Sequence, residues 1–284
     1  MSIPLQERLD AVEIKVNIGA ADMLAAAECF GLANAEKRRR TIYFCEDLTG
    51  GDGPAGLPLL TGGVILRLRR NKGRPDDITA KLRPCAASQL TRRWIDARRG
   101  DGWEFRVEGD WAGPRRVVSA SLVAEIEEGI IEDLTAEGLP IPLVKKQRRF
   151  LEDCARGPVD LSRLTLLGPI EGTKWELDRK GREIVAEQWA VGDGLSFLEF
   201  SIRTRPEDAV EAQRDFEELF RAHGIDPGSV RETKTRIVLE HLARSVRPSA
   251  ERGRSTPGSL TAREEPRRGP NLEMGPIDRH PSQE

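Results

Sequence analysis

Several short segments of this chain carry charged residues at every second position, with apolar residues between them. Residues i and i+2 of a β-strand point to the same side, so VEIKV places Glu13 and Lys15 on one face and Ile14 on the other. The same alternation recurs with the pairs Arg67 and Arg69, Lys81 and Arg83, Lys146 and Arg148, and Glu199 and Arg203. A single charged face is typical of a sheet that faces water. Its recurrence on so many strands predicts a polar cavity inside a closed or strongly curved sheet.

The pattern along the rest of the chain predicts further strands and helices. The expected strands are 11–18, 41–47, 64–70, 77–84, 103–111, 142–153, 173–179, 183–191 and 196–205. The expected helices are 21–32, 90–99, 206–224 and 230–246, and the Gly/Pro-rich segment 48–63 is expected to be a loop. Segment 115–126 fits a strand or a helix, and its periodicity does not decide between them.

The predicted elements form one α+β domain in which antiparallel strands dominate. From about Pro248 onward Pro, Gly, Ser, Arg and Glu prevail and the apolar periodicity ends, which is typical of disorder. We therefore expect a folded domain over 1–245 and a disordered tail over 246–284.

Composition excludes several functional classes. Lys and Arg number 45 and Asp and Glu number 47, so no overall basic field draws the chain to nucleic acid. No apolar run is long enough to span a membrane, and the N-terminus lacks the pattern of a secretory signal. We expect a cytoplasmic protein with neither nucleic-acid nor membrane partners, and the sequence leaves its protein partners unknown. Its scattered cysteines are expected to be reduced, partly buried thiols: Cys29, Cys45, Cys85 and Cys154.

Familiar catalytic motifs are missing from the sequence. The Gly-rich GGDGPAG lacks the GK[ST] ending of a P-loop, no GxGxxG opens a helix, and no GxSxG occurs. Three histidines far apart in the sequence and no CxxC pair indicate neither a His- or Cys-based metal site nor a Ser-His-Asp triad.

The charged faces of the predicted strands remain as the candidate chemistry. The candidate inward cations are Lys15, Arg67, Arg69, Lys81, Lys146 and Arg148. Lysine and arginine together can neutralise a polyphosphate, and carboxylates at Glu13, Glu187 and Glu199 would hold Mg²⁺ or Mn²⁺ beside it. Burying so many like charges without an anionic ligand would be costly. Glu187 fits an ordinary surface glutamate equally well, and Glu108 fits a salt-bridge partner at the rim better than a ligand.

The order of the segments resembles the CYTH superfamily, also called triphosphate tunnel metalloenzymes. This superfamily includes class IV-type adenylate cyclases, thiamine triphosphatases and inorganic triphosphatases. The resemblance covers about residues 9–243 through VEIKV, RRTIYFCEDL, GVILRLRR, DITAKL, FRVEGDW, LVKKQRRFLE and GLSFLEFSI. It implies an antiparallel eight-stranded β tunnel with helices packed outside.

The resemblance also assigns roles to particular residues. The family's initial E-x-E-x-K reads Ala11 to Lys15 and its terminal E-x-E reads Glu199 to Ser201, so Ala11 and Ser201 replace two expected carboxylates. The remaining implied metal ligands are Glu13, Glu187 and Glu199. The implied phosphate-binding residues are Lys15, Arg40, Arg67, Arg69, Lys81, Lys146, Arg148 and Arg203, and catalytic roles are expected for Glu13, Lys15 and Lys81.

These residues predict a protein that binds a small-molecule triphosphate or nucleotide and hydrolyses its phosphoanhydride with Mg²⁺ or Mn²⁺. Two alternatives stay open. Adenylate cyclisation would require a base pocket, and no sequence feature specifies adenine. A binding module without turnover is favoured by the loss of carboxylates at Ala11 and Ser201.

Overall fold

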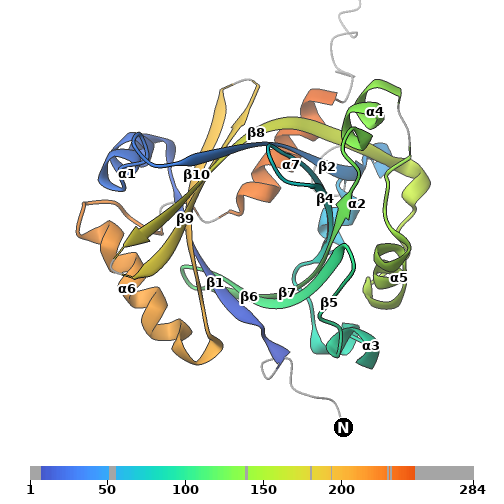
Figure 1. Ribbon diagram of the computed structural model, residues 1–284, viewed down its shortest axis with the longest axis horizontal. Helices are drawn as coiled ribbons and strands as arrows, with labels where there is room; N and C mark the ends of the chain where they lie inside the picture. Colours follow the sequence, from blue (N-terminus) through green and yellow to red (C-terminus); the bar gives the residue numbers. More distant parts are fainter. Residues whose placement is uncertain are drawn as a thin grey trace, which may run out of the picture. The chain divides into compact units, whose positions relative to one another are not determined.

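β-Strands join into one sheet that curves round and closes on itself, as Figure 1 shows. The structure is a computed structural model. It describes residues 8–50, 56–137, 140–179, 181–192, 194–228, 230 and 232–246. Apart from Val246, the tail expected over 246–284 lies outside the described residues.

Within the described residues, nine strands make up the ring. In ring order they are β1 (Ala11–Ile18), β10 (Leu195–Thr204), β9 (Arg182–Val191), β8 (Leu164–Arg179), β2 (Lys37–Asp47), β3 (Val64–Asn71), β4 (Asp76–Leu82), β7 (Arg115–Ile126) and β6 (Trp103–Ala112). The short strand β5 (Arg99–Gly100) pairs with β6 beyond the ring. Segment 115–126, which the periodicity left undecided, is therefore a strand.

The parallel pairing of β1 with β6 closes the ring, and the other neighbouring strands in it are antiparallel. The expectation of eight strands, all antiparallel, is wrong in both respects. Strand directions can alternate all the way round a ring only when the number of strands is even. A ring of nine must therefore contain a parallel pair.

Helices cover the apolar faces of the strands. They are α1 (Met23–Cys29), α2 (Pro58–Thr61), α3 (Arg92–Ile95), α4 (Ile130–Glu137), α5 (Lys145–Cys154), α6 (Ala209–Arg221) and α7 (Lys234–Val246). Phe216 and Phe220 of α6 pack on Phe200 of β10, and Phe150 of α5 packs on Phe105 of β6. No helix in the described ranges is long and apolar enough to cross a bilayer.

Helix α7 packs differently from α5 and α6. Its Val238 and Leu242 join a cluster with Ile65 of β3 and Trp189 of β9. Ile65 lies two residues before the inward-facing Arg67, so α7 packs against the inner side of the sheet. The expectation that all helices pack outside is therefore wrong for α7.

Segment 142–153 was predicted to be a strand and is mostly helix α5. Gln147, Phe150, Leu151 and Cys154 are its buried residues, at the three- and four-residue spacing of a helix face. The alternation of Lys146 and Arg148 that predicted a strand comes from the exposed side of this helix.

The other expected elements differ from the structure mainly at their ends. The helix expected over 21–32 is α1 preceded by a 3₁₀ turn, and the one expected over 230–246 begins at Lys234. The loop expected over 48–63 contains the short helix α2, and the strand expected at 173–179 is the end of the longer β8.

Gln147 connects α5 to the sheet, which gives a test of this packing. Its buried Nε2 donates to the carbonyl oxygens of Ile78 (2.8 Å) and Leu122 (3.0 Å). Gln147→Leu removes both hydrogen bonds and should lower the free energy of unfolding by about 1–3 kcal/mol, measured by chemical denaturation. Lys145→Ala on the exposed side of α5 should change it by less than about 0.5 kcal/mol. Equal stability of the two variants would contradict this account.

Candidate functional site

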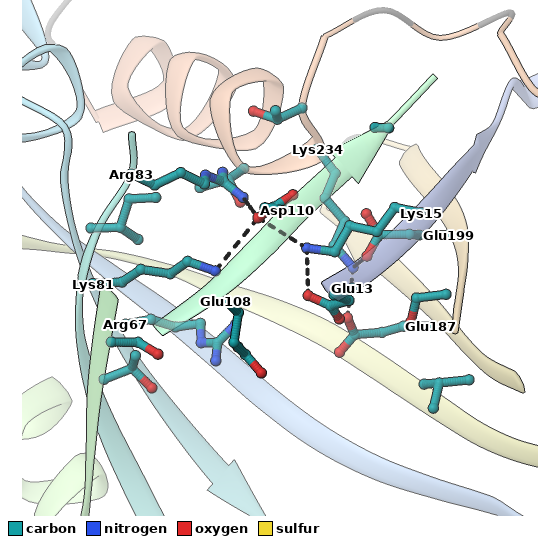
Figure 2. A pocket seen from close by; sticks show the side chains of 18 of the residues that line it. Glu13, Lys15, Arg67, Lys81, Arg83, Glu108, Asp110, Glu187, Glu199 and Lys234 are labelled. Carbon is teal, nitrogen blue, oxygen red and sulfur yellow. Dashed lines mark hydrogen bonds and ion pairs between the residues drawn. The ribbon is translucent and has the colours of Figure 1, made fainter. Parts of the chain in front are cut away.

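The closed sheet surrounds a cavity of about 490 Å³, called here the central cavity, whose charged side chains Figure 2 shows. Among the described residues, eleven cationic and six anionic side chains line it, an excess of five positive charges. The cations are Lys15, Arg40, Arg67, Arg69, Lys81, Arg83, Arg106, Arg115, Lys174, Arg203 and Lys234. The anions are Glu13, Glu108, Asp110, Glu183, Glu187 and Glu199.

Most residues that the sequence marked as candidates line the central cavity. These are Glu13, Lys15, Arg40, Arg67, Arg69, Lys81, Glu187, Glu199 and Arg203. Lys146 and Arg148 do not line it, because they lie on α5 outside the ring. The Lys146 ammonium lies 3.8 Å from the centroid of the Trp103 ring, and Arg148 donates to the carbonyl oxygen of Leu143. The expectation that these two side chains point into the cavity is therefore wrong.

Asp110 of β6 is a buried carboxylate that contacts three cations through Oδ2 and a fourth, Arg115, at 3.9 Å through Oδ1. Its Oδ2 lies 3.3 Å from Lys15 Nζ, 3.0 Å from Arg83 Nη1 and 3.6 Å from Lys81 Nζ. Burial opposes the charge on Asp110, but Lys15, Lys81 and Arg83 keep its pKa well below the usual range. One negative charge among three positive charges leaves this cluster, the Asp110 cluster, with a net positive charge (Figure 2).

Lys15 is the most strongly paired cation of the cluster. Its Nζ also lies 2.8 Å from Oε2 of Glu13, two residues before it on the same face of β1. Burial opposes its charge, but Asp110 and Glu13 raise the pKa of Lys15. Burial likewise opposes the charge on Glu13, and Lys15 nevertheless lowers the pKa of that carboxyl. Both groups are therefore ionised near neutral pH.

Two cations of the central cavity, Arg67 and Lys81, are only partly paired by the protein. Arg67 Nε is buried and has no hydrogen-bond partner among the described residues. Burial and the nearby charge of Arg69 lower the pKa of Arg67 to about 9. Burial also lowers the pKa of Lys81 to about 8; Asp110 opposes this shift, and Lys15 and Arg83 add to it. An anion in the central cavity would stabilise the charged form of both side chains.

Glu187 of β9 and Glu199 of β10 form a second cluster around Lys234, the first residue of α7. Lys234 Nζ lies 2.6 Å from Glu187 Oε2 and 2.8 Å from Glu199 Oε1. Arg40 Nη1 lies 3.5 Å from the other oxygen of Glu187. Burial raises the pKa of Glu187, but Lys234 and Arg40 more than offset it and hold that pKa below its ordinary range. Glu187 is therefore ionised, and both carboxylates already contact the ammonium group of Lys234.

The carboxylates expected to bind Mg²⁺ or Mn²⁺ do not fit a divalent metal as they lie. Glu13 contacts Lys15, while Glu187 and Glu199 both contact Lys234. In the described part of the chain, no group of three or more His, Cys, Asp or Glu side chains is placed to hold a metal ion. These three carboxylates already contact cationic side chains of the protein, namely Lys15, Lys234 and Arg40.

Sequence reasoning left Arg83, Asp110 and Lys234 out of the site. Arg83 follows Lys81 at the same two-residue spacing, and Asp110 continues the alternation of Arg106 and Glu108 along one strand. Those two residues could have been found from the pattern. Lys234 begins a helix far along the chain from Glu187 and Glu199, so no local pattern marks it.

The fold and this site define a class: a closed sheet whose interior is positively charged and suited to a polyanion. Among solved structures, the fold is similar to that of HpAC1 from Hippeastrum, a proposed adenylyl cyclase reported to have a dominant triphosphatase activity. That structure is 14% identical, with a TM-score of 0.51 over 81% of this chain and 96% of the other. A proposed adenylate cyclase from Bacillus halodurans is 12% identical, with a TM-score of 0.50 over 80% of this chain and 97% of the other.

The chain therefore shares the fold of these two proteins, which agrees with the resemblance that the order of its segments indicated. The sequence alone matches no protein-family profile. A search of curated proteins also finds no match.

The charge on Lys81 gives a testable pH dependence of stability. Its pKa is lowered to about 8 in the folded protein, and an unfolded lysine titrates near pH ~10.4. Between these values the unfolded chain binds more protons, so stability rises with pH. From roughly pH 7.5 to pH 10, the wild type should gain about 1–3 kcal/mol relative to Lys81→Met in denaturant titrations.

Lys146→Met, which removes an exposed lysine outside the ring, is the matched control and should show a smaller change over the same range. If the difference in the free energy of unfolding between the wild type and Lys81→Met does not change with pH, burial does not disfavour the charged form of Lys81.

Proposed function

We propose that the central cavity binds the triphosphate group of a small molecule, either inorganic triphosphate or a nucleotide. The observation that carries the proposal is the convergence of Lys15, Lys81 and Arg83 on one buried carboxylate, Asp110, with a positive excess remaining. A terminal phosphate carries about −1.5 to −2 charge near pH 7, and each further phosphate of the chain adds negative charge. A triphosphate therefore suits this positively charged cavity.

The types of cation also favour phosphate. Arginine presents two parallel N–H groups to phosphate oxygens, and lysine adds a compact charge that adapts its position. Arg67 has a buried Nε without a partner among the described residues, and a phosphate oxygen would supply one. The reported triphosphatase activity of the Hippeastrum protein supports a triphosphate ligand for this fold.

The proposal extends to hydrolysis of the bound triphosphate. Glu13, Lys15 and Lys81 were the expected catalytic residues; Lys15 contacts Glu13, and Lys15 and Lys81 share Asp110. Phosphoryl transfer depends mainly on positioning and on neutralising charge on the phosphate oxygens, which such cations supply. Because the carboxylates do not fit a metal, we assign no catalytic step to one.

Calorimetric titration with inorganic triphosphate, ATP and inorganic phosphate tests the binding proposal. We expect triphosphates to bind more tightly than phosphate, because more oxygens reach the cations. Arg67→Met and Lys81→Met should each weaken triphosphate binding by about tenfold or more, since each removes a charge-assisted contact. Arg148→Met, outside the ring, should leave the affinity within about twofold of the wild type.

Loss of affinity in Arg148→Met equal to that in Arg67→Met would place binding outside the central cavity. No binding of any triphosphate would refute the proposal. The same ligands, incubated with Mg²⁺, Mn²⁺ or chelator and assayed for phosphate and cyclic nucleotide, separate hydrolysis and cyclisation from binding without turnover.

A further inference from the structure

Lys234 reaches into the central cavity from the first turn of α7, and its side chain is only 9% exposed. Its ammonium lies between the carboxylates of Glu187 and Glu199 and 4.3 Å from the centroid of the Trp189 ring. Figure 2 shows the Lys234 side chain entering the cluster from the α7 side. Neither phosphate binding nor helix packing by itself requires a lysine at this position.

The backbone forces Glu187 and Glu199 together. They are direct partners in the antiparallel pairing of β9 with β10, so their side chains leave the same face of the sheet side by side. Two adjacent buried carboxylates repel each other unless a cation lies between them. Lys234 supplies that cation, and Arg40 adds a second charge beside Glu187.

A divalent ion would need the same space. Mg²⁺ requires near-octahedral oxygen ligands at about 2.0–2.1 Å, so a lysine ammonium in contact with both carboxylates excludes it from the position between them. Among the described residues, Ala11 and Ser201 stand where carboxylates are expected, Glu13 is paired with Lys15, and Asp110 is paired with Lys15 and Arg83.

We propose that Lys234 takes the place of a divalent cation between Glu187 and Glu199, so that the central cavity holds its triphosphate ligand without a metal ion. The second part rests on the proposed function, whereas the first concerns only the protein and a metal. In this arrangement the positive charge near the carboxylates is covalently part of α7. Its presence does not depend on the concentration of Mg²⁺ or Mn²⁺ in solution.

Titration with MnCl₂ in the absence of any phosphate tests the first part. We expect the wild type to bind Mn²⁺ weakly, and Lys234→Met to bind it about tenfold or more tightly, because two paired carboxylates lose their cation. Lys174→Met is the matched control: Lys174 also lines the central cavity, but its ammonium contacts Glu176. It should gain no Mn²⁺ affinity, and the double variant Lys234→Met with Glu199→Gln should lose the gain.

Titration of the wild type with inorganic triphosphate in excess chelator tests the second part. We expect the affinity in chelator to equal or exceed that in Mg²⁺. Binding that requires Mg²⁺ or Mn²⁺ would overturn the inference while leaving the proposed function standing. If triphosphate binds under neither condition, the proposed function fails, and the Mn²⁺ titration still decides the role of Lys234.

The Lys234→Met variant could lose its fold because two buried carboxylates become unpaired. Lys234→Arg keeps the charge and serves as the second variant, and it should bind Mn²⁺ as weakly as the wild type. Tight Mn²⁺ binding by the wild type itself, or by Lys234→Arg, would overturn the inference whatever the stability of Lys234→Met.

Discussion

The parallel pairing of β1 with β6 is the constraint on which the rest of the structure depends, because it turns an open sheet into a closed one. The two strands approach closely at Gly109, where a Cβ atom would lie 3.0 Å from the Cγ2 of Val12. Once the ring is closed, alternate side chains of each strand point either outward to the packed helices or inward to the central cavity. Apolar side chains such as Ile14 face the packed helices, while Glu13 and Lys15 face the central cavity. In an open sheet the same charged face would face water.

Closure gathers many charges into a confined space, and two residues of opposite sign organise them. Asp110 is an anion whose Oδ2 contacts three cations, and Lys234 is a cation that contacts two anions. These two clusters neutralise much of the charge. The chain does not fully compensate Arg67 and Lys81, whose pKa values are lowered chiefly by burial. Buried cations without a full set of counterions are typical of a ligand site, because an anionic ligand supplies the missing negative charge.

The sequence predicts this structure well where the information is local. Alternation within β1, β3, β4 and β10 correctly indicated strands and brought most candidate residues to one cavity. The same two-residue rule failed at Lys146 and Arg148, because residues two apart on a helix can both be exposed, and the buried spacing of Gln147, Phe150 and Leu151 was the better signal. The parallel closure and the position of Lys234 depend on which distant segments become neighbours. No pattern within a single segment carries that information.

Ala11 and Ser201, which stand where the resemblance implies carboxylates, are consistent in charge with the presence of Lys234. A divalent cation held by two carboxylates is neutral as a group, so replacing those carboxylates by Ala11 and Ser201 and omitting the cation leaves the net charge of the cavity unchanged. The other two carboxylates, Glu187 and Glu199, still need a counterion, because unpaired buried charges are unfavourable. Lys234 provides one at 2.6 and 2.8 Å. Under the proposal that Lys234 takes the place of a divalent cation, the loss of two carboxylates and the presence of one lysine are a single electrostatic solution, and the cavity keeps its attraction for a polyanion.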